Sequence, residues 1–123
     1  MANDQVISGL VGVRSAIGVG AWVAPRISGR LFGLDVPGNP QAPYLARLFG
    51  VRDAALAYGL QSTKGAARAQ WLKVGIACDL ADALAGVFAG RRGELPRFAT
   101  VLVTGTALGA AALGLAALQR GQT

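Results

Sequence analysis

Four apolar segments, each close to the length that crosses a lipid bilayer, constrain this chain more than any other feature. They cover residues 6–24, 44–60, 71–89 and 98–118. A helix needs about 20 mainly apolar residues to span the hydrocarbon core of a membrane. A water-soluble chain of this size should instead form helices with one polar face. The segments therefore predict an all-α fold in which residues 1–123 form a single domain, a bundle of four transmembrane helices running up-down-up-down.

The connections and the N-terminus fit a multi-pass protein of the cell membrane. Pro25 ends the first segment and Pro96 opens the last, while a longer proline-rich connection covers residues 25–43. Asp4 precedes the first apolar segment and no basic region does, so we expect that segment to be retained as a helix, not cleaved as a signal peptide. Loop charges are nearly balanced between the two sides. The small excess of basic residues in the first and third connections favours termini outside the cytoplasm without fixing the orientation.

The charge and the residue composition exclude several classes of function. The formal net charge is +6, yet the basic residues stand between or at the ends of the apolar segments. This placement suits lipid headgroups and argues against nucleic-acid binding. The chain has no histidine and a single cysteine, Cys78. Since histidine is the commonest metal ligand, we predict no metal and no cofactor, and we expect Cys78 to fill space in the core.

Charged side chains inside three of the segments are the main candidates for function. They are Arg14, Arg47, Arg52, Asp53, Asp79 and Asp82. A lone charge at the bilayer centre costs at least about 2.5–3.5 kcal/mol. Their depths predict mutual pairing, with Arg47 meeting Asp82. Arg14 and Arg52 are then expected to serve Asp53 and Asp79, which brings the net charge of the group to zero.

Two interpretations of these charges remain open. Ion pairs can lock the register of helices without any chemical role. Alternatively, ionisable groups inside a membrane mark a binding site or a proton relay. In that case the candidate acids and bases are Asp53, Asp79 and Asp82. The candidate orienting or ligand-binding residues are Arg14, Arg47, Arg52 and Tyr58, although the Tyr58 ring is equally suited to packing or to the membrane interface.

The motifs in these segments resemble a known family. Arg14 is followed by Gly18 and Pro25, the second segment contains Arg47-x-x-Gly50-x-Arg52-Asp53, and the third contains Asp79-x-x-Asp82. This pattern is similar to that of the small four-helix integral membrane proteins filed as domain of unknown function 4267. The resemblance covers nearly the whole chain and implies a membrane location and a shared charged centre. It implies no activity.

Three functions follow as hypotheses. The first is an intramembrane Arg/Asp site that binds a small apolar, lipid-like molecule or transforms it by acid–base chemistry. The second is a non-catalytic accessory or homo-oligomeric subunit of a membrane complex, since Gly105 and Gly109 could pack on a helix of another protein. The third, a proton-coupled transporter, is disfavoured because four helices are few and no inverted repeat is visible.

Overall fold

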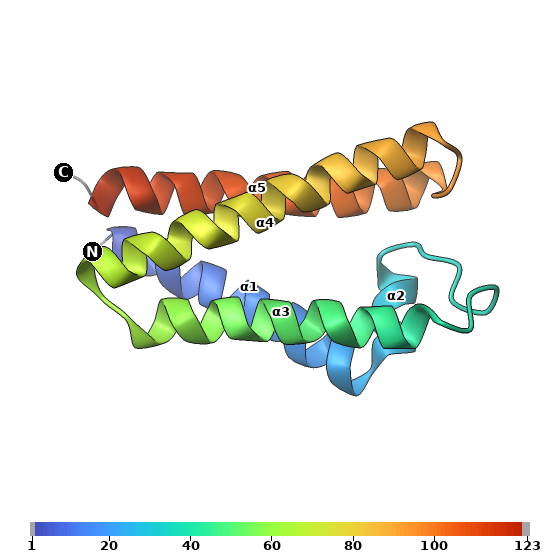
Figure 1. The fold of residues 1–123 in the computed structure, drawn as a ribbon, viewed down its shortest axis with the longest axis horizontal. Helices are drawn as coiled ribbons and strands as arrows, with labels where there is room; N and C mark the ends of the chain where they lie inside the picture. Colours follow the sequence, from blue (N-terminus) through green and yellow to red (C-terminus); the bar gives the residue numbers. More distant parts are fainter. Residues whose placement is uncertain (1, 122–123) are drawn as a thin grey trace.

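The computed structural model describes residues 2–121, and within that range every regular element is a helix. The five helices are α1 (Ala2–Val23), α2 (Pro25–Leu31), α3 (Ala42–Ser62), α4 (Gly65–Arg91) and α5 (Arg97–Gly121). Consecutive long helices run in opposite directions, so the start of α1 and the end of α5 lie at the same end of the molecule (Figure 1). The all-α prediction is confirmed, and α2 is an additional short helix inside the predicted connection.

Proline and glycine set most of the helix boundaries. α1 stops at Val23, and Pro25 opens α2, where its fixed φ and missing N–H are tolerated. α4 ends at a Schellman motif, in which Gly93 has a φ of 71°, its N–H bonds Gly90 O and the N–H of Glu94 bonds Ala89 O. The connection implied between the predicted segments 44–60 and 71–89 is wrong beyond Lys64. There α4 already begins, because Ala, Arg and Gln are strong helix formers.

α1 packs closely along α3 because glycines face each other where the two helices cross. A Cβ built on Gly18 would come within 2.8 Å of Ala54 N and Gly50 O, and one built on Gly50 would come within 2.5 Å of Gly18 O. Small residues of this kind let two backbones approach, as in packed transmembrane helices. The crossing therefore fixes which faces of α1 and α3 turn toward the remaining helices.

α4 and α5 form a second closely packed pair. Here glycines of α4 lie against threonines of α5: a Cβ on Gly86 would meet Thr104 Oγ1 at 2.5 Å, and one on Gly90 would meet the Thr100 side chain. Thr100 is held in turn by a 3.0 Å hydrogen bond from its Oγ1 to Pro96 O. The molecule thus consists of two helix pairs, α1 with α3 and α4 with α5 (Figure 1).

The two pairs meet in an apolar core near the chain ends. Five buried residues from all four long helices form this core: Ile7, Leu10, Leu60, Leu72 and Ala117. From the turn at Thr63 and Lys64 onward, α4 leads away from α3 and crosses the bundle (Figure 1). The charged side chains of the candidate site lie where α1 and α3 face α4.

Two helices are long and apolar enough to cross a membrane by length and composition, Asn3–Val23 and Arg97–Gly121. Only 28% and 22% of the residues in their most apolar stretches are buried within the molecule, so most of these residues are at least partly exposed. α3 and α4 are comparably long, but every 18-residue stretch of either helix contains at least three charged residues, more than such a span carries. The four long helices alternate in direction as predicted, but length and composition single out only two of them as spans, so the predicted four-span bundle is not confirmed.

Candidate functional site

A buried, two-pronged ion pair joins α1 to α4. Arg14 Nη1 donates to Asp79 Oδ1 at 3.1 Å and Nη2 donates to Asp79 Oδ2 at 2.6 Å, and both side chains are nearly inaccessible. A two-pronged Arg–carboxylate contact fixes orientation as well as distance. Gly75, one turn before Asp79, leaves room for the guanidinium, since a Cβ there would come within 2.9 Å of Arg14 Nη2.

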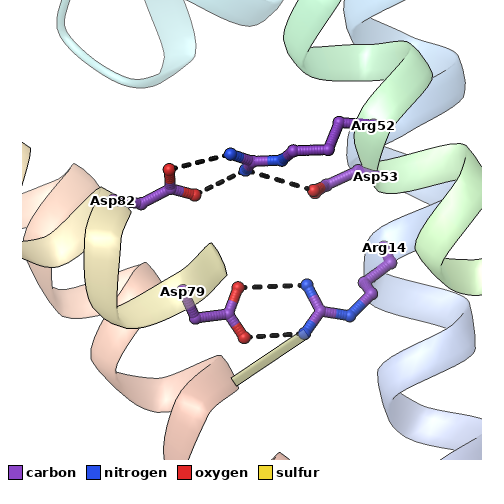
Figure 2. Close-up of polar contacts among 5 residues, drawn as sticks. All are labelled: Arg14, Arg52, Asp53, Asp79 and Asp82. Carbon is purple, nitrogen blue, oxygen red and sulfur yellow. Dashed lines mark hydrogen bonds and ion pairs between the residues drawn. The ribbon is translucent and has the colours of Figure 1, made fainter. Parts of the chain in front are cut away.

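A second two-pronged contact joins α3 to α4 just above the first (Figure 2). Arg52 Nη1 donates to Asp82 Oδ1 at 2.9 Å, and Nη2 donates to Asp82 Oδ2 at 2.5 Å. The Arg52 and Asp82 side chains are 33% and 30% exposed, so this pair lies at an open edge of the bundle. The Arg52 guanidinium also stacks over the Phe49 ring, with Cζ 4.6 Å from the ring centroid.

Asp53 lies beside these pairs with an incomplete set of partners. Asp53 is only 4% exposed. Its closest cation is Arg52, whose Nη2 lies 3.5 Å from Asp53 Oδ1. No hydrogen-bond donor of the described residues reaches that buried oxygen. Figure 2 shows the carboxylate directed from α3 toward the space between the two Arg–Asp contacts.

The predicted pairing is right for one arginine, partly right for a second and wrong for a third. Arg14 does serve Asp79, and Arg52 does contact Asp53. Arg52 also takes Asp82, the partner predicted for Arg47.

Arg47 is turned away from the cluster. Its Nε donates to Trp22 O at 3.0 Å, and its Cζ lies 5.9 Å from the centroid of the Trp22 ring. Arg52 comes five positions after Arg47 in the helix, which places the two side chains about 140° apart around α3. Arg47 therefore lies at a suitable depth along α3 to contact Asp82, but its side chain leaves the helix on a different side from the one that faces Asp82.

Two further sequence candidates stay outside the cluster. Tyr58 is 74% exposed on α3, so its ring faces away from the two Arg–Asp contacts. Cys78 is partly buried, and it precedes Asp79 on α4 without sharing its face. Sequence reasoning missed the role of Phe49, although its position one turn before Arg52 is the spacing at which helical side chains meet.

The chemistry open to the site is limited by how its carboxylates are used. Both oxygens of Asp79 and both oxygens of Asp82 accept bonds from guanidinium groups. Asp53 is the one carboxylate of the cluster with an oxygen that no described donor reaches. Within residues 2–121 no group of three or more His, Cys, Asp or Glu side chains is placed to hold a metal ion.

Fold and site together define an all-α bundle of two helix pairs connected by buried or half-buried Arg–Asp contacts. No family model, curated protein or solved structure matches the chain. The resemblance to the family filed as domain of unknown function 4267 therefore stays a prediction that these comparisons neither support nor contradict.

Proposed function

We propose that this protein is a four-span membrane protein of the cell membrane that acts as a non-catalytic, self-associating subunit, with its internal charges serving helix assembly. The observation that carries this proposal is the buried two-pronged contact between Arg14 and Asp79, which connects the two helix pairs. A charge pair with every carboxylate oxygen engaged is suited to holding helices together and poorly suited to acid–base chemistry.

The outer surface of α3 and α4 supports spans at these two helices as well. Large apolar side chains are exposed along both of them: Leu45, Leu48 and Val51 on α3, and Val74, Leu80, Leu84 and Phe88 on α4. The charged residues of these helices, apart from Arg47 and Lys73, lie on their inner faces or near the ends of α4. An outward apolar surface around inward charges is the arrangement expected of helices in lipid.

Self-association is supported by the outer face of α5. Gly105 and Gly109 are exposed, and beyond the adjoining backbone of α5 no atom of the described residues lies within 4 Å of the Cβ position of either glycine. Within the molecule, α5 packs through a different set of small residues: Ala99, Ala107, Ala111, Gly114 and Ala117. A second copy of α5 is our proposed occupant of the free face, since glycines four residues apart favour close helix pairing in lipid.

Cysteine crosslinking in membranes tests this function. The native Cys78 is replaced by alanine, and a new cysteine is placed at Ala112 on the glycine face of α5 or at Ala81 on the exposed face of α4. We expect the protein to stay in the membrane pellet after an alkaline carbonate wash. Oxidation should then give disulfide dimers for Ala112→Cys and far fewer for Ala81→Cys.

Replacing Gly109 with leucine in the Ala112→Cys background should remove most of the dimer, while Gly12→Leu, at an exposed glycine of α1 with equally open space, should not. Equal crosslinking at both cysteine positions, or release of the protein by carbonate, would contradict the proposal.

The second candidate function is binding of a small lipid-like molecule, and one observation favours it. Arg52, Asp82 and Phe49 are all partly exposed at the open edge between α3 and α4, so the polar head of an apolar molecule could reach them from the bilayer. Decanol serves as the test ligand. It should raise the melting temperature of the detergent-solubilised protein, and Arg52→Gln should abolish that shift. Arg47→Gln is the matched control, and an equal shift in both variants would dismiss this site.

A further inference from the structure

The charge balance of the buried cluster differs from the one predicted from the sequence. Because Arg47 is bound to the Trp22 carbonyl, it does not contribute to the cluster. Two guanidinium groups, Arg14 and Arg52, therefore contact three carboxylates. If all five groups are ionised, one negative charge is left without a partner in the interior of the bundle.

The hydrogen bonds of the three carboxylates show that Asp53 is the one that would carry the unpaired negative charge. Asp79 and Asp82 each accept two hydrogen bonds from an arginine. Asp53 has the 3.5 Å contact with Arg52 Nη2, and its buried Oδ1 is reached by no donor of the described residues. An unpaired buried carboxylate is far more costly than a neutral carboxyl group, and such groups usually become neutral instead of staying ionised.

We propose that Asp53 binds a proton inside the helix bundle, and that this proton keeps the Arg52 guanidinium on Asp82. A neutral Asp53 leaves the cluster with two positive and two negative groups. A neutral Asp53 also explains why Arg52 lies closer to Asp82 than to Asp53. The Arg52 Nη1 and Nη2 atoms lie 2.9 and 2.5 Å from the Asp82 oxygens, whereas Nη2 lies 3.5 Å from Asp53 Oδ1. This inference concerns the interior of one chain and does not depend on self-association.

The groups that face Asp53 come from three helices. Arg14 of α1, Asp79 of α4 and the neighbouring Arg52 of α3 are the charged groups whose fields act on it. Asp82 and Cys78 of α4 act on Arg52 in turn. Between its ends, Arg97 and Arg120, α5 contains no ionisable residue. When the proton leaves, Asp53 competes with Asp82 for Arg52 Nη2, so proton release weakens the contact that connects α3 to α4.

Infrared spectroscopy of the full-length protein in detergent micelles tests the proposal directly. At neutral pH exposed carboxyl groups are ionised, so a protonated-carboxyl band reports a buried acid. We expect one such band per chain in the wild type and its complete loss in Asp53→Asn. The band should persist in Asp35→Asn, which changes an exposed carboxylate, provided circular dichroism shows that each variant is folded.

A second measurement keeps the proposal testable if Asp53→Asn does not fold. The wild type should lose thermal stability as pH rises and the proton leaves, because the ionised Asp53 is then an unpaired buried charge. A folded Asp53→Asn should lack this loss. A wild type without the band at neutral pH, or a band that survives Asp53→Asn and disappears in Asp82→Asn, would overturn the proposal.

Discussion

Asp79→Ala is expected to destabilise the folded protein by about 3–5 kcal/mol, the cost typical of removing one partner of a buried ion pair. The reason is that Arg14 would stay in the interior with no carboxylate in place of the two oxygens that it now bonds. Its side chain is 6% exposed, so water cannot replace the lost acceptor. Unfolding in detergent, followed by circular dichroism over a denaturant series, gives the change in free energy.

A double variant separates the effect of the two charges on stability from the effect of the volume that the two side chains fill. Arg14→Leu with Asp79→Leu removes both charges together, and it should recover most of the stability lost in Asp79→Ala, because an apolar pair of suitable volume often matches a buried ion pair. Glu94→Gln is the control, since Glu94 is exposed in the α4–α5 turn. If Asp79→Ala were no more destabilising than Glu94→Gln, the contact would not hold the two helix pairs together.

Gly18→Ala is the second substitution for which we expect a large effect, a loss of about 1–3 kcal/mol, as for other overpacked sites. The added Cβ would lie 2.8 Å from Ala54 N and Gly50 O. Both are backbone atoms, so no side chain can rotate to make room and α1 must move away from α3. That shift would also displace Arg14 relative to Asp79, because Arg14 is one turn from Gly18 on the same face of α1.

Gly12→Ala provides the matched control on the same helix. No atom lies within 4 Å of the Cβ position at Gly12, so alanine there should be neutral or stabilising by up to about 1 kcal/mol through its higher helix propensity. Melting temperatures of the two variants, measured in one detergent, provide the comparison. Similar values for both would show that the close crossing at Gly18 does not limit the packing of α1 on α3.

The four long helices of this fold could be predicted from the sequence, because apolar segments bounded by proline and glycine mark most of their length, whereas the short helix α2 was not predicted. The main error in position, the late predicted start of α4, came from giving more weight to polar residues than to helix propensity near Arg68. The contact between Arg14 and Asp79 was also within reach, since both residues lie near the middle of their segments.

The partners of Arg47 and Arg52 could not be predicted from the depth of these residues along the helix axis alone. Whether Arg47 or Arg52 meets Asp82 depends on the rotation of α3 about its axis. The glycine crossing between Gly18 and Gly50 fixes that rotation, and no sequence pattern here specifies which glycines pair. With the wrong arginine assigned, the predicted charge balance was neutral and the surplus carboxylate of Asp53 could not be recognised.

The division of the charges between two helix pairs has a consequence for synthesis of the chain. α1 and α3 together carry two guanidinium groups of the cluster and one carboxylate, whereas α4 carries the other two carboxylates. Arg14 and its acceptor Asp79 are 65 residues apart, so the ribosome completes the first pair of helices before that acceptor exists. A nascent chain that stops in the turn before α4 is left with a surplus positive charge, which chemically distinguishes it from a finished one.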